Sequence, residues 1–364
     1  MSASTLVIQL SKEVKMMLDE RKLKILGAIV DEYIVTGEPV GSKTISKLAD
    51  INVSSATIRN DMAVLEQLGY LEQPHTSAGR IPTFSGYRLY IEKIMKENPL
   101  SEEDKQMLDS MLDTDAPTEE ALIQSASTAL AEVTKCAVVA SNLAPKYSVI
   151  TKVEVIPTGK RLYVLLLITS SGSIKNKVCR LEFDLTPEQL DFFSKYMEEN
   201  LSGVSLESLS EEMFQQIIVA MGAYMMTLSP LINAIYEMSK GLMQKELTVS
   251  GEKNLLQCKD FDHNEIVAFL EHKNELTELI DESFNGIQVL FGKEKDSFVI
   301  GNSSMISSQV KKDGKTAGSL GIIGPMRLDY KKVIPYIEYF TKKISDIISE
   351  EDIPDTPGKG PEEE

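Results

Sequence analysis

Four predicted helices and one polar turn within residues 21–100 constrain the fold of this 364-residue chain more than any other feature. Residues 21–36, RKLKILGAIVDEYIVT, carry apolar side chains at helical spacing, which predicts an amphipathic helix with one buried stripe. Glycine and proline at 37–41 end this pattern. Two further helices are predicted after it, because Ser42 and Ser54 each stand where a serine hydroxyl can cap a new helix.

The segment PHTSAGRIPT at 74–83 changes the pattern. Two short extended pieces flank a polar turn that contains Gly79, and prolines bound them, which is typical of a hairpin and not of central strands. Thr83 stands where it can cap a fourth helix, TFSGYRLYIEKIM. The sequence therefore predicts three helices, a hairpin and a further helix within about 80 residues.

This order of elements is typical of a winged helix-turn-helix, in which the third helix enters the major groove and the hairpin crosses the DNA backbone or minor groove. Arginine can pair with guanine and asparagine with adenine. The candidate DNA-binding residues lie at the start of the second helix, along the third helix and in the hairpin turn: Ser42, Lys43, Thr44, Ser54, Ser55, Thr57, Arg59, Asn60, His75, Thr76, Ser77 and Arg80. The alternatives are a capped helix with a solvated face, a hairpin that contacts nothing, or a head that binds protein.

The charge distribution agrees with a nucleic-acid interface more than the total charge does. The chain carries −17, which by itself argues against binding phosphates. Between Arg21 and Glu97, however, ten Lys/Arg face nine Asp/Glu, a net +1, so the other residues carry −18. We interpret this as an acidic body that keeps the protein dissolved and orients a less acidic head on DNA.

Beyond residue 100 the pattern indicates an α+β arrangement. Helix is predicted from about 101 to 131 with Pro117 as an interruption, and strand-like runs separated by Gly, Pro and Ser follow up to about 184, which we expect to form an antiparallel sheet. Thr186 and Pro187 signal a helix start. Helical segments continue to about 284, strand-like runs return in IQVLFGKE, SFVIGN and TAGSLGIIGP, and a long amphipathic helix, YKKVIPYIEYFTKKISDIIS, follows.

Strands, then helices, then strands favour one α+β domain with a mainly helical insertion over βαβ alternation. The expected parts are an extension at 1–20, a DNA-binding head at 21–100, an α+β domain in two pieces at 101–203 and 285–350, the insertion at 204–284 and a disordered acidic tail at 351–364.

The residue patterns predict neither an enzyme nor a cofactor or metal site. Cys136, Cys179 and Cys258 match no zinc or redox spacing and are expected to be buried thiols, and no nucleophile–histidine constellation is evident. The glycine string GSLGIIGP lacks phosphate-binding spacing, and Arg327 after it is expected to pair near the last helix. No stretch approaches the roughly 20 apolar residues that cross a bilayer, and no secretory signal is evident, so we expect a cytoplasmic protein without a membrane partner.

Several runs resemble one family. YIVTGEPVGSKTIS, VSSATIRNDMAVLEQLGYL, QPHTSAGRIPTFSGYRLYI and GIIGPMRLDY are similar to the heat-inducible transcription repressor family HrcA. The resemblance implies a homodimer with a winged-helix head, a GAF-like domain and an inserted dimerising domain. It also implies an inverted-repeat operator upstream of chaperone genes, a chaperonin that keeps the repressor active, and DNA contacts at 54–60 and 75–80. The resemblance also implies that heat inactivates the repressor.

Two other classes of function remain open. A GAF-like domain that senses a small molecule is one, and a bifunctional enzyme with a DNA-binding head is the other, although no nucleotide-binding loop is evident for the latter. A methionine-rich run between Met213 and Met243 suits either packing within the insertion or a partner surface. We expect this region to contribute to dimerisation, because a twofold pair of heads doubles the contacts over an inverted repeat.

Overall fold

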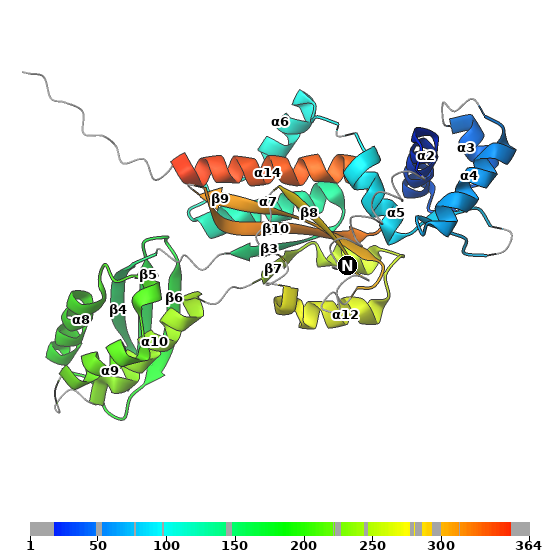
Figure 1. Ribbon diagram of the computed structural model, residues 1–364. Coiled ribbons are helices and arrows are strands. Elements are labelled where there is room, and N and C mark those ends of the chain that lie inside the picture. Colours follow the sequence, from blue (N-terminus) through cyan, green and yellow to red (C-terminus); the bar gives the residue numbers. More distant parts are fainter. Residues whose placement is uncertain are drawn as a thin grey trace, which may run out of the picture.

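The computed structural model describes residues 18–48, 53–75, 78–96, 98–142, 148–220, 222, 227–243, 247–276, 280, 286–292, 300–312 and 314–350. These residues form three packed units (Figure 1). We call residues 20–95 the head, residues 102–142 together with 247–350 the body, and residues 148–243 the lobe. The expectations for residues 1–17 and 351–364 lie outside the described residues.

The head begins with three helices, continues through a two-stranded antiparallel hairpin, and ends with a helix that runs directly into a π-helix. Its elements are α2 (Glu20–Thr36), α3 (Ser42–Leu48), α4 (Ser55–Gln67), β1 (Leu71–Glu72), β2 (Ile81–Pro82), α5 (Phe84–Leu89) and η1 (Tyr90–Ile94). The element order matches the prediction. Gly37, in a left-handed conformation at φ 69°, ends α2, and the predicted caps Ser54 and Thr83 each accept a hydrogen bond from the helix that follows.

Apolar residues on one side of each helix hold the head together. Ile29 of α2, Ile45 of α3 and Ile58 of α4 are fully buried in one core. Burial of such a side chain stabilises a fold by about 1.5–3 kcal/mol.

The body is built on a five-stranded antiparallel sheet in the order β7-β3-β10-β9-β8. Its strands are β3 (Ala137–Asn142), β7 (Leu247–Ser250), β8 (Ile287–Phe291), β9 (Ser303–Lys312) and β10 (Lys315–Pro325). Its helices are α6 (Glu102–Met111), α7 (Glu119–Thr134), α11 (Glu252–Gln257), α12 (His263–Glu271), the 3-10 turn η4 (Lys273–Leu276) and α14 (Tyr330–Glu350). Helices α7 and α14 cover one face and α12 lies across the other (Figure 1).

The lobe has its own sheet, in the order β4-β5-β6, and its own hydrophobic core. It contains β4 (Ile150–Gly159), β5 (Leu162–Thr169), β6 (Ile174–Arg180), α8 (Pro187–Leu201), η2 (Leu206–Ser208), α9 (Glu211–Ala220) and α10 (Ser229–Met243). The helices pack on the sheet face that carries Tyr163, Leu165 and Leu167. Because β4, β5 and β6 pair only with one another among the described residues, the lobe is separate from the body sheet.

Two features of the predicted body differ from the structure. The insertion is not mainly helical and does not start at 204, because the strands from 150 to 180 belong to it and share its core with α8. Nor does it extend to 284, because β7, α11 and α12 return to the body. Both sheets carry the same alternation of apolar and polar residues, so periodicity alone cannot assign a strand to one sheet or the other.

The strand content near the carboxyl end also differs. Strand β9 occupies 303–312, SSMISSQVKK, which was not predicted as a strand. Of the predicted strand SFVIGN, residues 300–302 are not in a strand and residues 297–299 lie outside the described residues. The serines Ser303, Ser304 and Ser307 are fully buried in β9, so its pattern is not apolar. Strand β7 lies in a range that was predicted to be mainly helical.

Candidate nucleic-acid interface

Helix α4 presents its polar face outward while its apolar face anchors it. Ile58 is fully buried, whereas Arg59 and Asn60, which follow it directly, are exposed. Ser55 and Thr57 are partly exposed on the first turn. Four of the predicted residues are therefore accessible on the first two turns of α4, Arg59 and Asn60 more so than Ser55 and Thr57.

The Ser54 hydroxyl is committed to the start of α4. Its Oγ accepts from the Thr57 backbone N–H at 3.2 Å and lies 3.0 Å from the Thr57 hydroxyl. This cap satisfies a backbone N–H that the helix itself leaves unpaired. Ser54 is thus a structural residue of the helix start, and its exposed position leaves the Thr57 hydroxyl at the surface.

A partly buried ion pair links α4 to α2. The Asp61 carboxylate, 6 % exposed, accepts from Arg21 Nε at 2.8 Å, and Lys22 Nζ lies 3.9 Å away. Asp61 follows Asn60, so this contact holds the exposed turn in place from behind. The hydrogen bond from the Arg21 guanidinium to Asp61 also raises the pKa of Arg21.

Arg59 and Arg80, both predicted to bind DNA, differ in what holds them. Arg80 donates from Nε to Glu66 Oε2 at 3.0 Å, and its second guanidinium nitrogen lies 2.8 Å from the same oxygen. The Arg80 side chain is only 19 % exposed. No ion-pair partner for Arg59 is found in the described part of the chain, and its side chain faces solvent.

The hairpin is also tied to the loop before α3. The backbone N–H groups of Val40 and Arg80 each donate to the other's carbonyl oxygen at 2.9 Å. A Cβ atom at Gly79 would lie 2.4 Å from the Val40 carbonyl oxygen, closer than atoms can approach. Gly79 is therefore needed for two backbones to cross, a reason that the sequence alone did not provide.

Helix α3 contributes basic side chains beside α4. Lys43 is exposed, and Ser42 and Thr44 are partly exposed. Ser42 is the first residue of the helix and not its cap, since Thr44 and Ile45 donate to the carbonyl of Gly41. Sequence reasoning missed Lys47, which is exposed and four residues after Lys43, a spacing that puts both lysines on one helix face.

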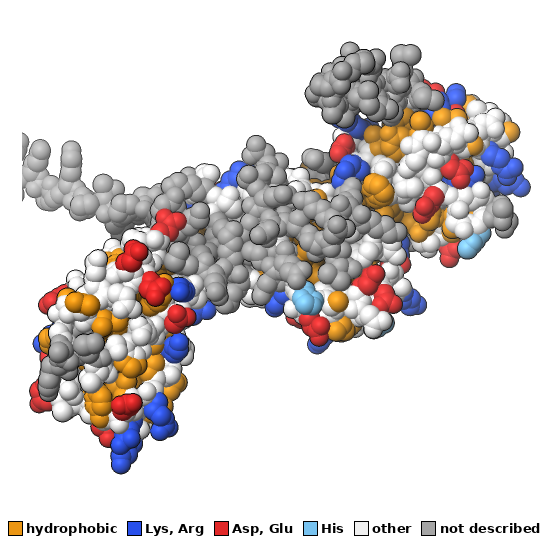
Figure 2. Space-filling model, turned by 60° about the horizontal axis from the view of Figure 1, so that its bottom comes forward, with side chains coloured by type: hydrophobic (Ala, Val, Ile, Leu, Met, Phe, Trp, Pro, Cys, Tyr) orange, Lys and Arg blue, Asp and Glu red, His pale blue; other side chains and the backbone are white. Residues whose placement is uncertain are grey.

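The turn of the hairpin is described in part. His75 is exposed, whereas Thr76 and Ser77 lie outside the described residues. In Figure 2 basic side chains gather at the outer end of the head, away from the body. The accessible residues of α3, α4 and the hairpin thus offer hydrogen-bond donors and positive charge, the combination that phosphates and base edges recognise.

Arg327 and the three cysteines, which the sequence analysis singled out, lie outside the head. Arg327 Nε donates to Asp260 Oδ2 at 2.8 Å, which confirms that this arginine is paired, although its partner lies just before α12. Cys136 is buried, as predicted, and Cys179 and Cys258 are half-buried free thiols. Burial raises the pKa of the Cys136 thiol to about 11.

The described residues contain neither a metal cluster nor a membrane-spanning helix. These residues contain no group of three or more His, Cys, Asp or Glu side chains suited to a metal ion. Within the same ranges, no helix combines the length and the apolar character that a bilayer crossing requires.

Comparisons with known proteins give a consistent result. Residues 120–334 match the family model described as HrcA protein C terminal domain. The "Heat-inducible transcription repressor HrcA" of Acetivibrio thermocellus is 34% identical over 338 residues, which are 91% of this chain and 96% of that protein. The protein of the same name from Ruminiclostridium cellulolyticum is 34% identical over 338 residues, 91% of this chain and 97% of that one.

A solved structure has a similar fold. It is described as a hypothetical protein, is 24% identical, and superposes with a TM-score of 0.65 over 92% of this chain and 99% of that one. At this identity the similarity concerns the α+β fold alone.

Proposed function

The chain belongs to the HrcA family of heat-inducible transcription repressors, and on that premise we propose that it is a homodimeric repressor with a winged-helix head. In this proposal the head binds an inverted-repeat operator upstream of heat-shock chaperone genes in the cytoplasm. Heat inactivates the protein and a chaperonin keeps it active. The body is a GAF-like domain, and the lobe is the dimerising insertion.

The observation that carries the proposal is the accessible face of α4. Arg59 and Asn60 are exposed on a helix that Asp61 and Ile58 hold from the opposite side. An arginine can donate two hydrogen bonds to a guanine edge, and an asparagine can pair with adenine, each contact adding about 1–3 kcal/mol of discrimination. We assign base reading to Arg59 and Asn60, with Ser55 and Thr57 beside them at the first turn.

Contacts to phosphates complete the assignment. Lys43 and Lys47 are exposed on α3. Helix α3 is the first helix of the helix-turn-helix pair, the one that crosses the DNA backbone in such motifs. Thr44 and Ser42 flank them, and His75, with Thr76 and Ser77, would extend the contacts along the hairpin. Phosphate contacts set register and affinity but carry no sequence information directly.

Two of the predicted DNA-binding residues hold the local structure of the head and do not contact DNA in this proposal. Ser54 caps α4 and Arg80 is paired with Glu66. We propose that both act through the elements that they hold, Ser54 through the start of α4 and Arg80 through the angle of the hairpin.

The homodimer is supported by an open apolar sheet face on the lobe. On the side of the lobe sheet opposite its core, Ile156, Val164 and Val178 form one cross-strand row, and Ile168 pairs with Ile174. Ile174 and Val178 are each 59% exposed. Hydrophobic side chains accordingly reach the surface of the lobe in Figure 2. We propose that two copies meet through this face, since exposed apolar surface of this kind marks interaction sites.

Heat acts in this proposal by loosening the body or the lobe and so separating the paired heads. The lobe core and the body core are separate clusters, so one can open before the other. A chaperonin would then return the opened chain to its dimeric form.

The proposal is tested with full-length protein and duplexes from the regions upstream of chaperone genes. Fluorescence anisotropy should show tight binding to an inverted repeat and much weaker binding to a scrambled duplex, with affinity falling steeply as salt rises. Equal affinity for both duplexes at every salt concentration would refute sequence-specific repression.

A further inference from the structure

The polypeptide link between the head and the body does not by itself fix the angle between them. The π-helix η1 ends at Ile94, Met95 is extended, and the described residues that follow have no regular structure until α6 begins at Glu102. A short irregular connection permits a range of orientations. The angle of the head must therefore come from side-chain contacts between the two units.

Part of that contact is a polar three-residue group. Asp31 of α2 accepts from the Tyr90 hydroxyl at 2.5 Å and from Lys331 Nζ at 2.7 Å, both at Oδ1. Lys331 also lies 5.7 Å from the centroid of the Tyr90 ring. Asp31 and Tyr90 belong to the head, whereas Lys331 is in the first turn of α14 in the body, so one carboxylate joins the two units.

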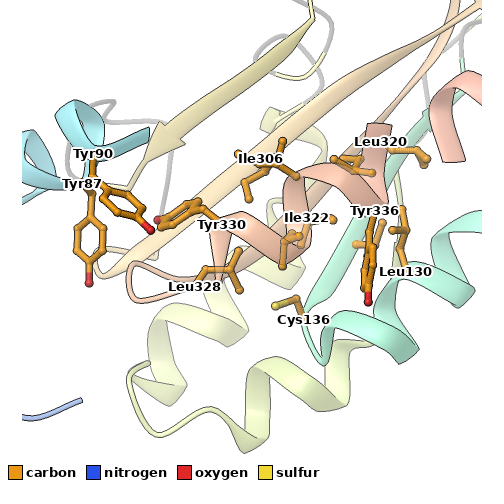
Figure 3. Packing of buried hydrophobic residues seen from close by; sticks show 14 of the residues in the cluster. Tyr87, Tyr90, Leu130, Cys136, Ile306, Leu320, Ile322, Leu328, Tyr330 and Tyr336 are labelled. Atoms are coloured by element: carbon orange, nitrogen blue, oxygen red, sulfur yellow. The ribbon is translucent and has the colours of Figure 1, made fainter. Parts of the chain in front are cut away.

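An aromatic contact lies beside this group. The Tyr87 ring of the head lies 5.9 Å from the Tyr330 ring and 6.4 Å from the Phe291 ring of the body. Figure 3 shows Tyr87, Tyr90 and Tyr330 at this junction. Apolar contacts have little directional preference, whereas both donors must reach one oxygen of the Asp31 carboxylate. The ion pair is thus the directional part of a junction that also contains a shared apolar core.

The same chemistry recurs on α14, away from the head. Asp109 of α6 accepts from the Tyr339 hydroxyl at 2.7 Å and from Lys343 Nζ, and Lys343 lies 5.9 Å from the Tyr339 ring centroid. The two lysines are similarly exposed, 33% for Lys331 and 30% for Lys343. Lys343 therefore provides a matched control within the same helix.

We propose that Lys331 and Asp31 are a positioning pair that fixes the orientation of the head on the body, and thereby selects the spacing between operator half-sites that the dimer accepts. The inference rests on the proposed function, because spacing has meaning only for a dimer on an inverted repeat. Two linked heads bind together most strongly when their geometry matches the two half-sites. When the orientation of the head on the body is no longer fixed, the dimer gains less affinity from binding both half-sites together. It then also accepts other spacings between them.

The test uses full-length protein and inverted-repeat duplexes enriched by the wild-type protein from a random-sequence pool. Spacers between the half-sites are then lengthened and shortened one base pair at a time, and dissociation constants are measured by gel shift. For the wild type we expect affinity to fall about tenfold or more away from the preferred spacing. For Lys331→Ala we expect a flatter profile, with weaker binding at the preferred spacing and unchanged binding to a single half-site.

Two variants separate positioning from charge. Lys343→Ala removes the same positive charge and should keep the wild-type spacing profile. Asp31→Asn removes a negative charge instead, yet should flatten the profile as Lys331→Ala does. A general electrostatic effect on DNA would move the two variants in opposite directions.

A measurement without DNA keeps the inference distinct from the proposed function. Hydrogen exchange of backbone amides at the carboxyl end of α2 and in η1 should speed up in Lys331→Ala and not in Lys343→Ala, while α4 stays protected in both. Unchanged exchange together with an unchanged spacing profile would overturn the positioning pair. Absence of any wild-type preference for an inverted repeat would instead refute the proposed function.

Discussion

Arg80 and Glu66 form an ion pair at 2.8 Å that joins the hairpin of the head to the last turn of α4. The pair is partly shielded from solvent, at 19% and 33% side-chain exposure. An arginine in a hairpin turn is easily assigned a DNA contact, but the Arg80 guanidinium is already paired with the Glu66 carboxylate. Its effect on binding is expected through the angle of the hairpin and not through a phosphate.

Salt dependence distinguishes the two roles of Arg80. Loss of one phosphate contact lowers the slope of log affinity against log salt by about 0.9. We expect Arg80→Ala to leave that slope unchanged while it weakens binding, and Lys47→Ala to lower it. A double-mutant cycle of Arg80→Ala with Glu66→Ala, followed by urea unfolding, should give a coupling of about 1 kcal/mol. A reduced slope for Arg80→Ala would show that Arg80 contacts DNA directly.

Arg59→Ala should reduce sequence discrimination without reducing stability. The side chain is exposed and holds no partner in the described residues, so the melting temperature should stay at the wild-type value. Preference for the selected operator over one with a changed guanine should fall by about 1–3 kcal/mol. Gln67→Ala, an exposed position near the end of the same helix, is the control and should keep full preference.

Tyr87→Phe should stabilise the protein. The Tyr87 hydroxyl is buried and lacks a hydrogen-bond partner among the described residues, and desolvation raises its pKa far above the usual range. Removing a buried, unpaired hydroxyl should raise the free energy of unfolding by about 1 kcal/mol. Tyr90→Phe removes the hydroxyl that donates to Asp31 and should lower it by a similar amount. Urea unfolding that ranks the two variants in the reverse order would contradict this account of the junction.

Alkylation of Cys136 should report opening of the body. Its pKa of about 11 keeps the folded thiol protonated at pH 8, and its burial blocks reagent access. We expect mass spectrometry to show slow reaction with iodoacetamide at low temperature and a steep rise on heating. In the folded state the rate should rise only as the pH approaches 11, because the thiolate is the reactive form. Fast labelling of Cys136 at low temperature and pH 8 would show that the body is already open.

Local signals were the most predictable part of the fold. Ser54, Thr83 and Thr186 were each expected to cap a helix, and each accepts the expected backbone hydrogen bond. Capping depends mainly on residues within one turn, so the sequence contains most of the necessary information. Ser42, the first residue of α3 and not its cap, is the exception. The exposed face of α4 followed in the same way from the apolar spacing around Ile58.

Long-range partners were not predictable. Arg80 and Glu66 are 14 residues apart, and nothing in their local patterns indicates that they meet. Strand β9 was missed because its buried serines satisfy their hydroxyls through partners elsewhere, as Ser308 does with Thr341 of α14. The limits of the lobe were misplaced for the same kind of reason, since only tertiary packing separates its strands from those of the body.

The lobe leaves and re-enters the body between two strands that are already neighbours. Strand β3 ends at Asn142, β7 begins at Leu247, and Ser141 of β3 stands opposite Leu247 in the antiparallel pair. A tight turn could therefore replace the whole excursion and leave a continuous hairpin. Under the proposed function the lobe carries self-association, so a chain with such a turn in place of the lobe should be a monomer with a single head.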